Sequence, residues 1–197
     1  MPPTTKYDRD TIVEAAFEIA KESGFSGIST RAVARRLGCS VAPIYQNFAT
    51  VDELSAAVVE RVSAMSGELL AAQTGPNPFE NMGKASLAFA RDYPALFREM
   101  ALEPNDFITP HEQIEDAMAP LMAADPELAG WTDAARRRLF LKMRVFQLGL
   151  SAMVANGHLP AWMDEKAAEE LLLETGEEIA AGMQATRKHV TGKDEQQ

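Results

Sequence analysis

Hydrophobic residues recur along this chain every three or four positions and almost never alternate, a pattern that predicts α-helices throughout. The first helix is expected over residues 8–23, ended by Gly24, with an apolar stripe of Ile12, Ala15, Ala16 and Ile19. A long helix is expected over residues 51–73, with a stripe of Leu54, Val58, Val62 and Met65. Both stripes have the spacing of a helix that is buried on one side.

Two shorter helices joined by a tight turn are predicted between these long ones. Ser29 precedes the first short helix and can cap its free N–H groups, and Gly38 ends that helix because glycine adopts a left-handed backbone at little cost. Ser40 is expected to cap the second short helix, over residues 41–48, and Pro43 falls in its first turn, where proline is tolerated. Thr50 and Glu53 then form a capping box for the next helix.

The second short helix has one apolar and one mixed face. Ile44 and Phe48 are four residues apart and share the inner side. The outer side carries Val41, Ala42, Tyr45, Gln46 and Asn47. A short helix, a turn with glycine and a second helix with such an outer face are typical of a helix-turn-helix that enters a DNA major groove. Spacing alone leaves open a tight helical hairpin with no DNA partner.

Gly75 to Pro78 interrupt the helical pattern, and further helices are expected over 80–92, 93–103, 110–124, 132–156 and 164–188. The last two carry apolar residues on more than one stripe, so each needs partners on two sides. The predicted fold is all-α. It consists of an N-terminal three-helix helix-turn-helix DNA-binding domain, residues 1–50, and a C-terminal helical-bundle domain for ligand binding and dimerisation, residues 51–197. Helix 51–73 links the two domains.

Charge is unevenly distributed. The net charge is −10, yet residues 1–50 carry six Lys and Arg against five Asp and Glu, and the remainder carries 13 against 24. The acidic body is expected to disfavour non-specific DNA binding. Cys39 is the single cysteine, no stretch reaches the ~18 apolar residues of a membrane span, and no signal peptide is visible, so we expect a cytoplasmic protein without membrane contact.

The helix-turn-helix stretch resembles the DNA-binding domain of the TetR family of transcriptional regulators over about residues 7–58. The matching positions are Thr30-Arg31, Val33-Ala34, Leu37-Gly38, Ser40, Ile44-Tyr45, Phe48 and Leu54. Two positions depart from the family pattern. Val51 stands where relatives often have a phosphate-contacting lysine, and Pro43 stands where a polar residue such as threonine is usual.

The resemblance implies that helix 41–48 lies in the major groove of a double-stranded DNA operator. Arg31 is then the candidate for a bidentate guanine contact, and Gln46 for a hydrogen bond to a base edge. Val41 and Ala42 are expected to touch thymine methyl groups. The expected phosphate contacts are Thr30, Ser40, Tyr45 and Asn47.

The resemblance also implies a homodimer on a palindromic operator, paired through the helices near 132–156 and 164–188 as a four-helix bundle. From the residues alone, these two helices could instead complete a monomeric core. Nine phenylalanines and ten methionines supply apolar bulk, and TetR-family members usually bind a small effector in this domain. The expected ligand pocket residues are Met82, Phe89, Phe97, Met100, Phe107, Met118, Met122, Phe140, Met143 and Phe146. Each of them could also be ordinary core.

No catalytic, cofactor or metal site is predicted, and the protein is not expected to be an enzyme. His111 and Glu115 could share a metal, but no third ligand is in view. The predicted function is a ligand-responsive repressor released from DNA by an apolar effector. The alternative is a helical small-molecule binding protein whose helix-turn-helix no longer binds DNA, which Val51, Pro43 and the net acidity favour.

Overall fold

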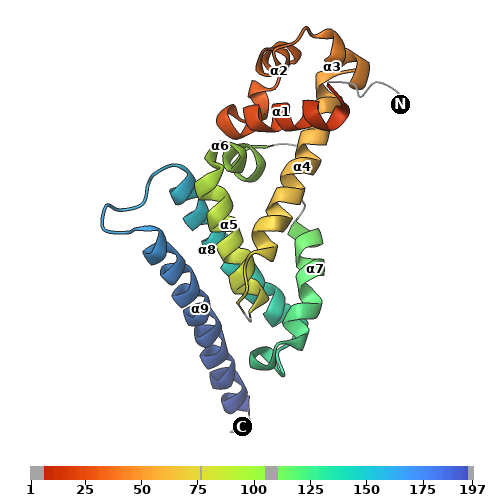
Figure 1. The fold of residues 1–197 in the computed structure, drawn as a ribbon. Coiled ribbons are helices and arrows are strands. Elements are labelled where there is room, and N and C mark those ends of the chain that lie inside the picture. The colour runs from red at the N-terminus through yellow and green to blue at the C-terminus, as the bar shows by residue number, and fades with distance from the viewer. Residues whose placement is uncertain (1–6, 76, 105–110, 195–197) are drawn as a thin grey trace. The chain divides into compact units, whose positions relative to one another are not determined.

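The computed structural model describes residues 7–75, 77–104 and 111–194, which are mostly helical and include no β-strand (Figure 1). The prediction of an all-α fold is therefore confirmed for these residues. The chain forms two compact units, residues 1–74 with 88–108 and residues 75–87 with 109–197. α5 (Pro78–Asp92) begins in the second unit and ends in the first. No helix within the described ranges combines the length and the apolar character needed to cross a lipid bilayer.

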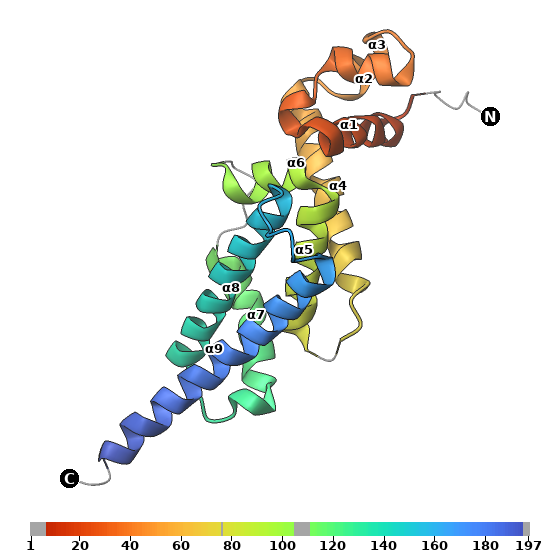
Figure 2. The same ribbon diagram turned by 90° about the vertical axis from the view of Figure 1, so that its left-hand side faces the viewer.

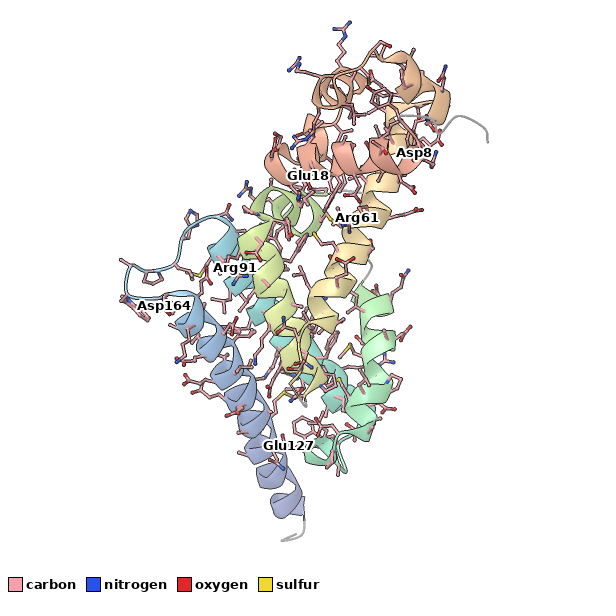
Figure 3. The ribbon with its side chains drawn as sticks, in the orientation of Figure 1. Asp8, Glu18, Arg61, Arg91, Glu127 and Asp164 are labelled. Carbon is pink, nitrogen blue, oxygen red and sulfur yellow. The ribbon has the colours of Figure 1, made fainter. Side chains whose placement is uncertain are left out.

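The first unit is organised around α1. Its elements are α1 (Arg9–Ser23), the 3-10 turn η1 (Phe25–Gly27), α2 (Thr30–Leu37), α3 (Ala42–Asn47), α4 (Val51–Ala71), α6 (Pro94–Phe97) and the π-helical turn η2 (Arg98–Leu102). α1 packs against α2, α4 and α6. Asp8 caps α1 by accepting a hydrogen bond from the backbone N–H of Thr11 at 2.9 Å, and the residue is labelled at the start of this helix in Figure 3.

A single buried cluster holds the first unit together. Ile12, Val33, Ile44, Leu54, Val58, Val62 and Leu96 are all fully buried in it. Burial of a large aliphatic side chain stabilises a fold by about 1.5–3 kcal/mol, so this cluster fixes α2 and α3 on α1. The apolar stripes that the sequence predicted for α1 and α4 are the surfaces that face this core.

The expected domain boundary at residue 50 differs from the grouping in the structure. α4 lies along α1, and Leu54, Val58 and Val62 complete the core of the first unit. Residues 88–108 also join this unit, because Phe89, Leu96 and Phe97 are apolar and lie at or close to the same cluster. The helix that the sequence predicted as a link between two domains thus lies wholly within the first unit and contributes to its core.

The second unit contains the first part of α5 together with α7 (His111–Ala124), the 3-10 turn η3 (Pro126–Leu128), α8 (Asp133–Ala155) and α9 (Glu165–Asp194). α8 and α9 run side by side, as Figures 1 and 2 both show, and α7 also packs against α8. One buried cluster surrounds Met122, Trp131 and Phe140, and a second joins Leu87, Leu150 and Leu172.

Two predicted helices differ from the structure by more than a few residues or in their type. The helix expected over 93–103 begins at Pro94, with proline in its first turn, but changes at Arg98 into the π-helical turn η2. The last helix, expected to end at residue 188, continues to Asp194. Charged and polar residues after 188 removed the apolar period on which the prediction relied, although they do not break a helix.

Candidate nucleic-acid interface and ligand cavity

The first helix of the helix-turn-helix has the ends that the sequence predicted. The Ser29 hydroxyl accepts a hydrogen bond from the backbone N–H of Ala32 at 3.1 Å and caps α2. Gly38 ends the helix with φ 65° and ψ 35°, the left-handed conformation that glycine adopts readily. The Cys39 N–H then donates to the Ala34 carbonyl at 3.0 Å, which closes the turn.

The start of α3 differs from the prediction, because Ser40 does not cap it. The N-cap is Val41, whose backbone is already helical, at φ −71° and ψ −14°, and no side chain caps this end. The Val41 carbonyl accepts hydrogen bonds from the N–H groups of Ile44 and Tyr45 at 3.1 and 3.3 Å. The backbone thus closes this end itself, one residue after Ser40, and Pro43 lies in the first turn as expected.

The two faces of α3 lie as predicted, with one exception. Ile44 and Phe48 are buried, whereas Tyr45 is 56% exposed and Val41 is 37% exposed. Ala42 and Gln46 are exposed too. Asn47 is only half-buried, and its side-chain amide donates to the Pro43 carbonyl at 2.8 Å and to the Tyr7 carbonyl at 3.4 Å. The exposed surface of α3 is therefore formed by the side chains of Val41, Ala42, Tyr45 and Gln46.

Arg9 on α1 clamps the end of α3. Its guanidinium donates to the Asn47 carbonyl at 2.9 Å and to the Glu53 carboxylate at 3.1 Å, and it lies 4.1 Å from the centroid of the Phe48 ring. Sequence reasoning missed this clamp, because Arg9 and Asn47 are 38 positions apart and no local pattern joins them. Arg9 thus connects the end of α3 to both α1 and α4.

The start of α4 is capped almost as predicted. The Thr50 hydroxyl accepts a hydrogen bond from the Glu53 N–H at 3.1 Å. The Glu53 carboxylate, however, accepts from the N–H of Ala49 at 2.9 Å, one residue before the expected partner, Thr50. This N–H and Arg9 together hold the pKa of the Glu53 carboxyl below its ordinary value. The loop between α3 and α4 is thus fixed from both sides.

The arginines of α2 are not equivalent. Arg36 donates two hydrogen bonds to the Glu22 carboxylate, at 2.8 and 3.1 Å, and this pairing lowers the pKa of Glu22. Arg31 and Arg35 are exposed and form no ion pair with any residue that the structure describes. Thr30, beside Arg31, is half-buried at the first position of α2. Positive charge on α2 is therefore available at Arg31 and Arg35, while that of Arg36 is balanced.

Glu99, in η2, holds the loop that precedes α2. Its carboxylate accepts hydrogen bonds from the backbone N–H of Phe25 and from the hydroxyl of Ser26, the latter at 3.1 Å. Gly24 lies directly against this carboxylate with φ 76°, and a Cβ atom there would collide with it. This link spans 74 positions along the chain and had no sequence signal.

An apolar cavity of about 750 Å³ lies within the second unit. Of the predicted pocket residues, Met82, Met122, Phe140, Met143 and Phe146 line it. Met118 is buried in the adjoining cluster but is not part of the lining.

The other predicted pocket residues do not line this cavity. Phe89, Phe97 and Met100 lie in the first unit, where the Phe89 and Phe97 rings meet edge to face with centroids 6.2 Å apart. Phe107 falls outside the described residues. Arg144 and Gln147 also line the cavity, and sequence reasoning missed them because charged and polar residues on a helix ordinarily belong to its solvated face. Within the described parts of the chain, no three His, Cys, Asp or Glu side chains are placed to hold a metal ion.

A glycine-ended turn between two short helices, with the second helix anchored by Ile44 and Phe48 and open on its other side, defines a helix-turn-helix DNA-binding domain. Residues 12–58 match the family model described as "Bacterial regulatory proteins, tetR family". The resemblance inferred from the sequence is thereby confirmed for these residues, which form a DNA-binding domain of the TetR type.

A solved structure extends the likeness beyond the matched domain. The crystal structure of a TetR-like transcriptional regulator from Rhodococcus sp. RHA1 is similar to this chain with a TM-score of 0.61 and 22% sequence identity. The match covers 90% of this chain and 96% of the other, and at this identity it shows a shared fold. No curated protein is significantly similar to the chain in sequence.

Proposed function

We propose that this protein is a cytoplasmic, ligand-responsive repressor that binds a palindromic operator as a homodimer and is released by an apolar small molecule. The observation that supports DNA binding best is the placement of α3, whose inner residues Ile44 and Phe48 are buried while Tyr45 and Gln46 are exposed. A B-DNA major groove is about 12 Å wide and admits one helix presented in this way.

The proposed base contacts come from both helices of the motif. Arg31, exposed and without an acidic partner among the described residues, is suited to donate two hydrogen bonds to O6 and N7 of a guanine. Gln46 is proposed to hydrogen-bond a base edge, and Val41 and Ala42 to touch thymine methyl groups. These side chains are all exposed, so none of them must leave the core to reach DNA.

The proposed phosphate contacts are Thr30, Ser40 and Tyr45, which fix the register of the helix without reading sequence. For Asn47 we propose a positioning role instead of the phosphate contact expected from the sequence. Its amide N–H groups already serve the carbonyls of Pro43 and Tyr7, so they brace the end of α3.

Exposed apolar residues on α8 support the proposed homodimer. Leu141, Val145 and Met153 are 48%, 64% and 39% exposed, and with Gly149 they recur every four residues along one side of the helix. Nothing lies within 4 Å of the position that a Cβ atom would take at Gly149, so another helix can approach closely there. A second copy of α8, with α9 beside it, would bury this stripe in a four-helix bundle.

The continuity of α5 supports the proposed response to a ligand. Met82, in its first half, lines the cavity, whereas Phe89, in its last turns, packs in the first unit. The chain then continues through α6 into η2, where Glu99 holds the loop before α2. A ligand that binds one arrangement of α5 more tightly can therefore shift the population of states that fit DNA.

The test begins with selection of operators by the purified full-length protein from a random DNA pool. Arg31→Ala is expected to relax specificity at one base position by about 1–3 kcal/mol, measured by competition gel shift. Arg35→Ala, on the same helix, is the matched control and should weaken all sequences about equally. Unchanged discrimination by Arg31→Ala would contradict the proposed guanine contact.

A second candidate function is a small-molecule binding protein that does not use DNA. The balancing of Arg36 by Glu22 and of Arg9 by Glu53 favours it, because both pairs remove positive charge from the region that would meet phosphates. Selection that enriches no sequence, together with ligand binding in the cavity, would support this candidate and reject the repressor.

A further inference from the structure

One basic residue lines the apolar cavity of the second unit. The wall is formed mainly by side chains such as Phe79, Met82, Met122, Leu139, Phe140 and Met143. Arg144 lies among them on α8, half-buried, and is the single Lys or Arg in the described lining. It forms no hydrogen bond or ion pair with any described residue. A half-buried cation without a partner is uncommon in a folded protein, because desolvating a charge is unfavourable unless another group compensates.

The acidic residues of the lining do not supply that partner. Glu127, labelled in Figure 3, and Glu177 are exposed to solvent. Asp125 already accepts a hydrogen bond from the Glu127 N–H at 2.9 Å and caps η3. Glu80, at the start of α5, is half-buried and makes no ion pair with Arg144. Burial alone lowers the pKa of Arg144, and arginine remains charged in proteins, so its positive charge stays uncompensated.

A polar neighbour is held beside Arg144. Gln147 lies three residues further along α8, on the same side of the helix, and also lines the cavity. Its side-chain amide donates to the Ser86 hydroxyl, which lies 3.2 Å from the hydroxyl of the fully buried Ser151. The amide has a second N–H that this network does not use. Arg144 and Gln147 thus offer several donors at one place in an otherwise apolar wall.

We propose that the ligand of this cavity is an amphipathic monocarboxylate, with its carboxylate bound by the Arg144 fork and by Gln147 and its apolar body against the phenylalanine and methionine side chains. The inference rests on the proposed ligand-responsive function and specifies the chemical class of the effector. Arginine binds carboxylates through two parallel hydrogen bonds, which adds orientation to the charge attraction. An uncharged ligand would leave the guanidinium desolvated and unpaired, and a cationic ligand would meet a like charge.

The test compares ligands that share one apolar chain and differ in the head group. Decanoate, decanol, decylammonium and decyl phosphate are titrated into the purified full-length protein, without DNA, in an isothermal calorimeter. Decanoate is expected to bind at least about tenfold more tightly than decanol, the ratio that one charge-assisted hydrogen bond supplies. Decylammonium should bind more weakly than decanol.

Variants of Arg144 test whether this residue causes the preference for decanoate. Arg144→Gln should weaken decanoate binding by about tenfold or more and leave decanol binding unchanged, whereas Arg144→Lys should keep part of the preference because it keeps the charge. Arg138→Gln, which removes an exposed arginine of α8 that does not line the cavity, is the matched control and should bind decanoate as the original protein does.

Each outcome decides the proposal. If decanoate and decanol bind equally well, and Arg144→Gln changes neither affinity, the proposed carboxylate head group is wrong. The proposed function, a repressor released by an apolar effector, is then unaffected. Tighter binding of decyl phosphate than of decanoate overturns the assignment of a carboxylate head group. Failure of all four probes to bind, with operator binding intact, overturns the proposal and leaves DNA binding unaffected.

Discussion

The paired charges around the helix-turn-helix contrast with the unpaired arginine in the cavity of the second unit. In the first unit, Glu22 pairs with Arg36, and Glu53 accepts hydrogen bonds from Arg9 and from a backbone N–H beside α3. In the second unit, Arg144 lines a cavity without a partner among the described residues. This difference corresponds to two different functional requirements. A surface that reads DNA must be held in one geometry, whereas a site proposed to bind a ligand can keep a charged group whose partner, on that proposal, is the ligand.

Packing differs in the same way. Ile12, Val33, Ile44 and Leu54 are completely buried in the first unit. In the second unit, Met82, Met143 and other large side chains surround a cavity of about 750 Å³. Methionine adapts to irregular shapes, so we expect the second unit to accommodate a ligand more readily than the fully buried cluster of the first unit.

The largest expected effect is a difference between two phenylalanine truncations. Phe48→Ala should lower the free energy of unfolding by about 3–5 kcal/mol, because the ring is buried and also packs against Arg9. Phe146→Ala should cost less, about 1–2 kcal/mol, because the half-buried ring borders existing space. Chemical denaturation of both variants measures the two losses.

Measurements of DNA binding give a second test of the two phenylalanine variants. Phe48→Ala should abolish operator binding even at temperatures where the protein remains folded, since α3 loses its anchor. Phe146→Ala should retain operator binding and alter only the response to ligands. Equal losses of stability, or loss of DNA binding in Phe146→Ala, would show that the two units do not differ in packing as described.

The next effect concerns the carboxylate that holds the loop before α2. Glu99→Ala removes the acceptor of the partly buried Phe25 N–H and should destabilise the first unit by about 1–3 kcal/mol. Operator affinity should fall, because α2 follows this loop directly. Denaturation and gel shift measure the two losses. The control is Glu60→Ala, an exposed residue of α4 without a partner in the described chain, and an effect as large there would refute the role of Glu99.

Local interactions account for what the sequence could predict about this unit. Ser29, Gly38 and Thr50 act within four residues of their partners, so spacing alone was sufficient to place them. Arg9 and Glu99 act across 38 and 74 positions, and no periodicity connects such pairs. The faces of the helices were therefore predictable, whereas the side chains that fix the helices to one another were not.

The lining of the cavity was also only partly predictable from the sequence. An apolar period indicated that Met82 and Phe89 would both be buried, but it could not indicate in which unit. α5 crosses between the units, so Met82 lines the cavity and Phe89 packs on the other core. Arg144 was overlooked for the opposite reason, because an arginine on an amphipathic helix is ordinarily part of the solvated face.

A smaller change in stability, this time an increase, is expected from a substitution of Arg144. Arg144→Met replaces an unpaired, half-buried charge with an apolar side chain of similar length and should raise the free energy of unfolding by about 1 kcal/mol. Denaturation without ligand measures the gain. Arg138→Met, at an exposed position of the same helix, should change stability little. Destabilisation by Arg144→Met would show that the arginine has a structural partner after all.

The smallest expected effect is a difference between the two units in their stability at low pH. Hydrogen bonds lower the pKa of Asp8 through Thr11, of Glu22 through Arg36, of Glu53 through Ala49 and Arg9, and of Asp92 through Arg91, and all four carboxyls belong to the first unit. A carboxyl with a lowered folded-state pKa contributes stability that is fully present above its ordinary value, 3.8 for aspartate and 4.5 for glutamate. That stability is lost as the pH falls through the lowered value.

The first unit should therefore unfold in acid before the second. Hydrogen exchange at pH values from 5 downward, about where the ordinary carboxyls begin to titrate, should show protection lost in α2 and α3 while α8 remains protected. Glu53→Gln keeps an acceptor for the Ala49 N–H without a titrating proton, so its stability should depend less on pH in this window. Simultaneous loss of protection in both units, or an unchanged pH dependence in Glu53→Gln, would mean that these paired carboxylates do not set the acid stability of the DNA-binding unit.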